Sequence, residues 1–375
     1  MQIMVERNIP FGKEVFQTLG RVILYDGNDL QGLSAPETEV LVTRSNVRVD
    51  RKILSRLPEL IAILSPTIGV DHVDFAAIRA YEKAHFRPLP VINAPGSTAG
   101  GVGDYVLASV MQMQDRGRLS QGCTVGIWGY GNCGRAVAAR LRTINCDIVA
   151  YDPPLQQRSK GHFRSATPDG LLSTDCITVH LPLTTKQESP WPTQGIISSR
   201  ILGALKNKVL INTSRGDVLD EGAAVAFAKK NNIGLVLDVY KSEPAVDPDL
   251  VRHTVISTPH VAGSIRQGKV RALKQVYDRL CSIIKVRGNY NFQLAMERIR
   301  SPFQVSALPL ITTDRKMVMD VVKLEQLSGK LKAIFSSKNR QNDLDFVNLR
   351  KRSMRDEIIW PAKMKDNKFE PEPGI

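Results

Sequence analysis

Residues 124–141, TVGIWGYGNCGRAVAARL, join an apolar strand pattern to an amphipathic helix pattern through a glycine-rich turn. The turn has the spacing G-x-G-x-x-G at Gly129, Gly131 and Gly134. Between a strand and a helix, the first glycine permits a tight turn and the second lets the backbone approach a pyrophosphate. The third allows close packing of helix and strand. The stretch therefore predicts the opening unit of a dinucleotide-binding α/β domain.

The next apolar run, DIVAYD, ends at Asp152, about 20 residues after the glycines. A carboxylate at that place binds the ribose 2′-hydroxyl of NAD and repels the 2′-phosphate of NADP, and prolines rather than an arginine follow it. We therefore expect NAD as the cofactor. The candidate cofactor-binding residues are Gly129, Gly131, Asn132, Cys133, Gly134, Asp152, Leu181, Thr213, Ser214, Asp238 and Gly263.

Short apolar runs alternate with amphipathic stretches along most of the chain, which is typical of parallel sheets covered by helices. The expected strands are QIMV, RVILY, VLVTR, IAILS and PVINA, then TVGIWG, DIVAYD, ITVHLPL, KVLINTS, GLVLDVY and TVISTP. Helical patterns lie between them and over 98–115, 263–285, 316–335 and 346–359. The fold class expected is α/β, with two doubly wound parallel-sheet domains of the Rossmann or flavodoxin-like kind.

The 375-residue chain, with 42% hydrophobic and 23% charged residues, has the composition of a globular protein of two or three domains. Its net charge of +14 is not accompanied by a nucleic-acid-binding module. The basic cluster of Arg350, Lys351, Arg352 and Arg355 is expected to be a solvated helix face.

We find no bilayer-length apolar run and no signal peptide, and the five cysteines lack CxxC spacing. These features predict a cytoplasmic protein without a metal site, nucleic-acid partner or membrane partner. The last stretch, KMKDNKFEPEPGI, is expected to be frayed.

Three chemically distinctive residues follow ends of predicted strands: Arg215, Glu243 and His260. The carboxyl ends of parallel strands open on one crevice, so these residues are expected to lie together beside the cofactor. A base, a carboxylate partner and a cation suit the oxidation of a hydroxy acid. His260 would take the hydroxyl proton, Glu243 would orient the imidazole, and Arg215 would bind the substrate anion. Each residue alone has a structural alternative, so the prediction depends on their joint placement.

The segments GYGNCG with Asp152, NTSRG, DVYKSEP and TPHVAG, in this order, resemble the D-isomer-specific 2-hydroxyacid dehydrogenases over about residues 1–285. The arginine, glutamate and histidine of that family fall on Arg215, Glu243 and His260. The resemblance implies a discontinuous substrate-binding domain of residues 1–95 and 259–285, and an NAD-binding domain of residues 96–258. That family usually has Asn and Glu where this chain has Thr98 and Asp104.

Within that family, MQIMVERNIPFGKEVFQTLG, VTRSNVRV, PTIGVDHVD and FVNLRKRSMRDE resemble the erythronate-4-phosphate dehydrogenases. This implies oxidation of 4-phospho-D-erythronate in pyridoxine biosynthesis, and a small α+β dimerisation domain over 286–375 that makes a homodimer. The candidate substrate-binding residues are Arg44, Ser45, Thr67, Gly69 and Ser264. Ser45 and Thr67 come from the resemblance, Ser264 replaces a tyrosine of the subfamily, and Arg44 is our addition for the phosphate.

Two alternatives stay open. The chain could oxidise another D-2-hydroxy acid, which the replacement at Ser264 motivates. It could instead be an NAD(H)-sensing paralogue without catalysis, although the Arg215, Glu243 and His260 set argues against this.

Overall fold

The computed structural model describes residues 1–27, 35–306, 310, 312–336 and 341–360. The chain forms two compact units, one from residues 1–98 with 266–300 and one from residues 99–265 with 301–375. The chain therefore leaves the first unit near residue 98 and returns near residue 266. Residues 286–300 group with the first unit, and the residues after them group with the second.

The first unit contains a parallel sheet in the order β2-β1-β3-β4-β5. Its strands are β1 (Gln2–Glu6), β2 (Arg21–Tyr25), β3 (Val40–Val42), β4 (Ala62–Leu64) and β5 (Val91–Ile92). Its helices are α1 (Gly12–Phe16), α2 (Arg51–Leu54), α3 (Phe75–His85), α11 (Arg266–Ile283) and α12 (Phe292–Arg298).

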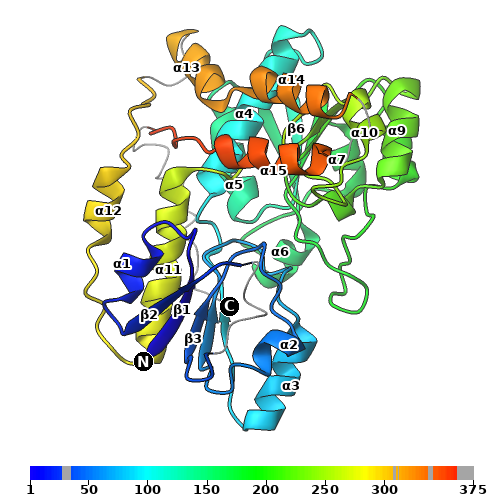
Figure 1. Cartoon of the computed structure of the whole chain (residues 1–375). Helices are drawn as coiled ribbons and strands as arrows, with labels where there is room; N and C mark the ends of the chain where they lie inside the picture. Colours follow the sequence, from blue (N-terminus) through cyan, green and yellow to red (C-terminus); the bar gives the residue numbers. More distant parts are fainter. Residues whose placement is uncertain (28–34, 307–309, 311, 337–340, 361–375) are drawn as a thin grey trace. The chain divides into compact units, whose positions relative to one another are not determined.

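Alternation along β1 explains the two layers of helices in this unit. Ile3 and Val5 share one buried cluster with side chains of α1 and α11, whereas Met4 belongs to another with side chains of α2 and α3. Successive strand side chains point to opposite faces, so each face receives its own helices (Figure 1).

The second unit contains a parallel sheet in the order β11-β10-β9-β8-β6-β7. Its strands are β6 (Thr124–Trp128), β7 (Asp147–Tyr151), β8 (Cys176–Val179), β9 (Val209–Asn212), β10 (Gly234–Leu237) and β11 (Ile256–Ser257). After β6 the chain builds β7 on one side and β8 on the other, so the strand order reverses between β6 and β8. In doubly wound sheets, the crevice at such a reversal is where ligands bind.

Helices cover both faces of the second sheet. On one face, α4 (Ala99–Asp115) and α5 (Asn132–Arg142) enclose a buried cluster that includes Val125 and Ile127 of β6. The cluster on the other face includes side chains of α7 (Pro168–Ser173), α8 (Ser199–Ala204), α9 (Glu221–Lys230) and α10 (Pro248–His253). The short α6 (Pro153–Arg158) and the 3₁₀ turn η1 (Gly216–Val218) follow β7 and β9. All the strands expected in both units are present.

The C-terminal region differs from expectation. The helix expected over 316–335 is two helices, α13 (Thr312–Val322) and α14 (Leu324–Ile334), because Lys323 adopts a left-handed conformation with φ of 55°. The last described helix, α15 (Asn342–Arg352), ends sooner than the pattern indicated. Beyond it the chain is extended and forms the isolated bridges Ile265↔Arg355 and Gln304↔Ile359.

The described part of the C-terminal region is therefore helical with isolated bridges, where an α+β arrangement was expected. Side chains of α14 and α15, namely Leu331 and Phe346, are buried in the core of the second unit. The stretch 363–375 lies outside the described residues. None of the helices in the described residues combines the length and apolar character that crossing a membrane requires.

Candidate active site

The glycine loop between β6 and α5 has the geometry that its sequence predicts. Gly129 has a φ of 93°, and a Cβ on Gly134 would lie 2.1 Å from the carbonyl oxygen of Gly129. A Cβ on Gly131 would meet nothing within 4 Å, so this residue borders open space. As the N-cap of α5, Gly131 also has no side chain to occupy the first N–H groups of the helix. A pyrophosphate fits here, because bare helix N-termini bind phosphate.

Asp152 lies beside this loop at the end of β7. One carboxylate oxygen accepts the N–H of Tyr130 at 2.8 Å, and the other accepts the N–H of Leu155 at 2.8 Å and so caps α6. The carboxylate therefore links the second strand of the motif to the glycine loop, at the position expected for the ribose of NAD. Its capping role was not apparent from the sequence.

The crevice at the strand-order reversal is closely packed around His180. A Cβ on Gly129 would lie 2.6 Å from the His180 carbonyl oxygen and 3.2 Å from Cδ2 of Leu181. The His180 ring lies between the hydroxyls of Thr178, at 2.9 Å, and Thr213, at 3.3 Å. Burial lowers the pKa of His180 to about 3, so the ring is neutral. His180 thus has a structural role, linking the ends of β8 and β9 through these two hydroxyls.

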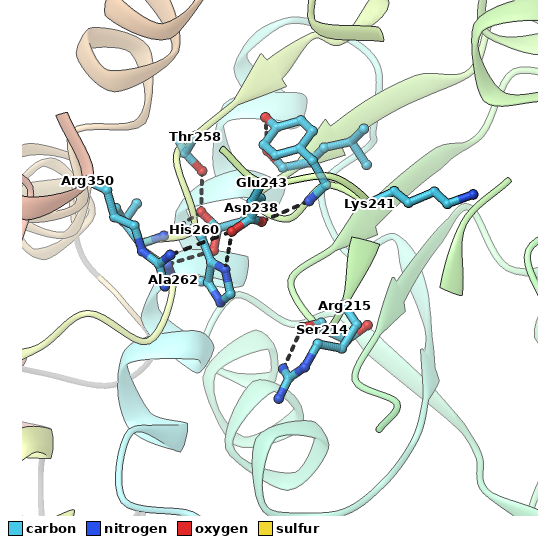
Figure 2. Close-up of polar contacts among 12 residues, drawn as sticks. Ser214, Arg215, Asp238, Lys241, Glu243, Thr258, His260, Ala262 and Arg350 are labelled. Carbon is cyan, nitrogen blue, oxygen red and sulfur yellow. Dashed lines mark hydrogen bonds and ion pairs between the residues drawn. The ribbon is translucent and has the colours of Figure 1, made fainter. Parts of the chain in front are cut away.

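Glu243 and His260 form a direct pair (Figure 2). Nδ1 of His260 is 2.8 Å from Oε2 of Glu243, and Oε1 of Glu243 accepts the backbone N–H of Tyr240 at 2.9 Å. Burial acts to raise the pKa of the Glu243 carboxyl, but His260 and Arg350 outweigh it and hold that pKa below its ordinary value. An ionised carboxylate only accepts hydrogen bonds, so Nδ1 carries the proton and Nε2 is left to act as a base.

Asp238 fixes the loop that carries His260. Its buried carboxylate accepts the Thr258 hydroxyl at 2.6 Å and the backbone N–H groups of Val261 and Ala262, each at 2.8 Å. Burial raises the pKa of Asp238, although His260 and these donors act against it. His260 itself has a φ of 56°, an uncommon conformation that these bonds on either side stabilise. Asp238, a candidate cofactor-binding residue, therefore also shapes the loop that carries His260.

Arg215 follows β9, Glu243 follows β10 and His260 follows β11, and these three strands are neighbours in the sheet. Nη1 of Arg215 donates to the carbonyl oxygen of Ser214 at 2.8 Å, and the Asn212 amide donates to the carbonyl oxygen of Arg215 at 2.9 Å. Figure 2 shows Arg215 on its own turn, in the same close-up as the Glu243–His260 pair.

The glycine after Arg215 is required by packing. A Cβ on Gly216 would lie 1.9 Å from the carbonyl carbon of Tyr240 and 2.2 Å from the nitrogen of Lys241. The turn that carries Arg215 thus packs directly on the backbone that leads to Glu243.

Four of the candidate substrate-binding residues lie in the first unit. Arg44 forms an ion pair with the buried Glu6, with Nη1 3.6 Å from Oε2. The Thr67 hydroxyl donates to the carbonyl oxygen of Gly69 at 2.8 Å and is 2.7 Å from the hydroxyl of Ser65, which also contacts Nε2 of His72 at 3.1 Å. Ser45 is exposed. The loop over 65–72 is thus ordered by its own hydroxyls.

Ser264 and the other candidates lie in the second unit. The N–H of Ser264 donates to the carbonyl oxygen of Val261 at 2.8 Å, and its own carbonyl oxygen accepts the N–H of Arg355 at 3.1 Å. In the described part of the chain, no group of three or more His, Cys, Asp or Glu residues is arranged to hold a metal ion.

The expectation that the basic cluster is a solvated helix face is wrong for Arg355, and Arg350 makes an ion pair that the expectation did not include. Lys351 and Arg352 are exposed, but Nη1 of Arg350 is 3.6 Å from Oε2 of Glu243. The Arg355 guanidinium donates to the carbonyl oxygens of Gly101, Val261 and Ala262, at 2.6, 3.0 and 3.0 Å. Helix α15 ends between these two residues, so a helical pattern over the whole cluster could not distinguish them.

Asp104 has a buried role that its sequence context did not indicate. Its Oδ1 accepts Nε of Arg140 at 2.9 Å and the indole N–H of Trp360 at 2.9 Å, and the Arg140 guanidinium lies 4.4 Å from the centre of the Trp360 ring. Asp104 therefore joins α4 and α5 to the C-terminal segment.

Comparisons with known proteins show the family of the chain. Residues 103–262 match the family model described as D-isomer specific 2-hydroxyacid dehydrogenase, NAD binding domain. An erythronate-4-phosphate dehydrogenase of Psychromonas ingrahamii is 32% identical over 294 residues, covering 77% of this chain and 74% of that protein. One from Salinibacter ruber is 34% identical over 291 residues, covering 76% and 72%.

Solved structures share the fold. An NAD-dependent formate dehydrogenase of Staphylococcus aureus in complex with NAD aligns with a TM-score of 0.59 at 23% identity, covering 78% of this chain and 97% of that one. A 3-phosphoglycerate dehydrogenase of Entamoeba histolytica with NAD⁺ bound aligns with a TM-score of 0.62 at 19% identity, covering 78% and 98%. The chain belongs to the D-isomer specific 2-hydroxyacid dehydrogenases, a family of NAD-dependent oxidoreductases.

Proposed function

We propose that this protein oxidises the 2-hydroxyl of 4-phospho-D-erythronate with NAD, giving 3-hydroxy-2-oxo-4-phosphooxybutanoate for pyridoxine biosynthesis. The observation that carries the chemistry is the 2.8 Å contact between His260 Nδ1 and Glu243 Oε2 at the ends of neighbouring strands. The choice of substrate is supported by the erythronate-4-phosphate dehydrogenases that are 32–34% identical to most of the chain.

In the proposed reaction, Nε2 of His260 takes the proton of the 2-hydroxyl. Glu243 holds the ring through Nδ1 and stabilises the imidazolium that forms, as a carboxylate partner does for other catalytic histidines. When bound, NAD supplies the acceptor for the hydrogen and electron pair that leave carbon 2. Arg215 binds the substrate carboxylate and stabilises charge at the developing carbonyl.

The cofactor-binding residues follow from the loop geometry. Gly129, Gly131 and Gly134 would receive the pyrophosphate at the start of α5, and Asp152 would bind the adenosine ribose. The remaining candidates, Asn132, Cys133, Leu181, Thr213, Ser214, Asp238 and Gly263, are proposed to complete the site.

A phosphorylated hydroxy acid has a carboxylate and a phosphate of about −1.5 to −2 charge, so it requires cations and N–H donors. We assign Arg44, Ser45, Thr67, Gly69 and Ser264 to this task. A homodimer formed through residues 286–375 is part of the same proposal, on the basis of the resemblance alone.

The first experiment follows nicotinamide absorbance in purified protein given NAD and 4-phospho-D-erythronate, with 3-phosphoglycerate and D-lactate in parallel. A single-turnover measurement detects reduction even if NADH stays bound. Reduction with phosphoerythronate alone is expected. Reduction with another acid would retain the mechanism and change the substrate. Clear NAD binding without any reduction would favour an NAD(H)-sensing protein.

The second experiment replaces His260 by alanine. Loss of a general base typically lowers turnover about 10²- to 10⁴-fold, while NAD binding should persist. His253→Ala is the matched control, since that histidine lies on α10, where its ring bonds to the carbonyl oxygen of Asp249. A near-normal rate for the His260 variant would refute the assignment of the base.

A further inference from the structure

Helix α15 brings a charged side chain to the Glu243–His260 pair. Nη1 of Arg350 lies 3.6 Å from Oε2 of Glu243, the oxygen that also contacts Nδ1 of His260 at 2.8 Å (Figure 2). The Glu243 side chain is 16% exposed and that of Arg350 is 40% exposed. The arginine thus approaches the pair from the solvent side, and the carboxylate is mostly enclosed.

The helix is held in this position by packing against the residue that orients Glu243. Phe346 is buried and meets the Tyr240 ring edge-on, with ring centres 6.2 Å apart. Tyr240 donates its backbone N–H to Oε1 of Glu243 at 2.9 Å. Residues four apart lie on one face of a helix, so Arg350 lies one turn beyond Phe346, over the same site. One face of α15 therefore meets Tyr240, which donates to Oε1 of Glu243, and also places Arg350 beside Oε2 of the same carboxylate.

The chain after α15 is anchored to the loop that carries His260. Arg355 donates to the carbonyl oxygens of Val261 and Ala262, the two residues that follow His260. The bridge Ile265↔Arg355 fixes the backbone of the same segment. The backbone at Arg350 is therefore fixed on both sides, by the buried Phe346 before it and by the bridged Arg355 after it. Its side chain reaches Glu243 from this fixed position.

We propose that Arg350 is a positioning residue of the reaction, which holds Oε2 of Glu243 toward His260 and makes the C-terminal helix part of the catalytic apparatus. The proposal rests on the roles proposed above for Glu243 and His260.

Charge gives the proposal a second consequence. Burial favours the protonated form of Glu243, and His260 with Arg350 outweighs it, so removing Arg350 raises the pKa of Glu243. The Asp238 carboxylate, after β10, also interacts with His260, and the Arg355 guanidinium, beyond α15, donates to the carbonyl oxygens of the two residues that follow His260. Both remain in place when Arg350 changes. A Glu243 carboxyl that is protonated at higher pH no longer accepts the Nδ1 proton of His260 there, so the acid limb of activity shifts to higher pH.

The test compares Arg350→Met, Arg350→Lys and the control Arg352→Gln. Methionine keeps the aliphatic stem and removes the charge, whereas lysine keeps the charge and lacks the paired N–H donors of the guanidinium. Arg352 is an exposed residue of the same helix. We expect the acid limb of the kcat/KM profile of Arg350→Met to move up by about half a pH unit, with kcat lowered about two- to fivefold. The KM for NAD should not change. Lysine should restore part of the shift, and the Arg352 variant should match the wild type.

An NMR titration separates this proposal from the proposed function. Imidazole ¹⁵N shifts, recorded with NAD and without substrate, report the Glu243–His260 pair directly. Failure of the wild type to oxidise any hydroxy acid would refute the proposed function, whereas the titration would still show whether Arg350 is coupled to the pair. Superimposable wild-type and Arg350→Met titrations would overturn the role of Arg350. If the methionine variant does not fold, Arg350→Gln, which also lacks the charge, takes its place: a shifted titration supports the proposal and an unshifted one opposes it.

Discussion

The cofactor preference can be tested through Asp152, because two variants separate its charge from its helix-capping bond. Its carboxylate accepts the N–H groups of Tyr130 and Leu155, each at 2.8 Å and each on a different oxygen. Asparagine caps a helix about as well as aspartate, so Asp152→Asn removes the charge and keeps the cap through its one amide oxygen. It loses the bond from Tyr130, because an amide nitrogen donates and does not accept. Asp152→Ala also removes the cap, at a further cost of about 1 kcal/mol in the free energy of unfolding.

The size of the charge effect follows from Coulomb's law. A 2′-phosphate of about −1.5 to −2 charge, roughly 5 Å from the carboxylate in a partly exposed site with an effective dielectric constant of about 40 to 80, is repelled by about 1 to 3 kcal/mol. That energy corresponds to roughly a 10- to 100-fold preference for NAD. Asp152→Asn should lose most of this preference, with a stability loss of about 1 kcal/mol for the missing bond from Tyr130.

The assay measures the dissociation constants of NAD and NADP by fluorescence titration, with thermal unfolding in parallel. Asp147→Asn is the control, because this exposed aspartate lies at the other end of β7. If Asp152→Asn kept the full preference and Asp152→Ala lost it, loop geometry rather than charge would be responsible. An unchanged preference in both would show that Asp152 does not meet the ribose.

Three further predictions concern stability and turnover. Gly216→Ala should cost about 1 to 3 kcal/mol by overpacking, since its Cβ would lie 1.9 Å from the Tyr240 carbonyl carbon, and should lower kcat; unaltered urea unfolding would contradict this. The pKa of His180 is about 3 in the folded protein and about 6.5 in the unfolded chain, so the unfolded chain binds more protons between these values. The free energy of unfolding therefore decreases as the pH is lowered below about 6.5. The loss should be about 2 kcal/mol between about pH 7 and 5, and His180→Asn should flatten that part of a stability–pH curve. Asp104→Ala should cost about 3 to 5 kcal/mol in chemical unfolding, because Arg140 and Trp360 lose their shared acceptor, whereas a loss below about 1 kcal/mol would show that solvent replaces it.

The sequence predicts the two sheets well because most of their strands, the edge strands β2 and β7 excepted, are largely buried. Runs such as residues 209–211 are apolar throughout, and such runs are recognisable without knowledge of their neighbours. The C-terminal helices were harder to predict. The break at Lys323 occurs within a continuous amphipathic pattern, and the early end of α15 depends on the bridge between Arg355 and Ile265. Neither feature has a local signal such as proline or glycine.

The candidate site divides in the same way. The glycine loop and Asp152 are contiguous features with a fixed spacing, and Arg215, Glu243 and His260 could be grouped because the carboxyl ends of parallel strands share one edge. The sequence did not indicate that Asp238 holds the His260 loop or that Asp152 caps a helix. A carboxylate at a strand end looks the same whether its partner is a cofactor or a backbone N–H group.

The sequence by itself therefore determined the α/β class, the strand positions, the dinucleotide loop and the three strand-end residues, because each depends on periodicity or spacing within a short segment. The tertiary structure decided what surrounds them. The contact of Arg350 with Glu243 joins residues 107 apart in the chain, and that of Asp104 with Trp360 joins residues 256 apart. Such pairs form when packing brings two surfaces together, as it does for Phe346 and Tyr240. No local pattern predicts which arginine of a basic cluster will contact Glu243.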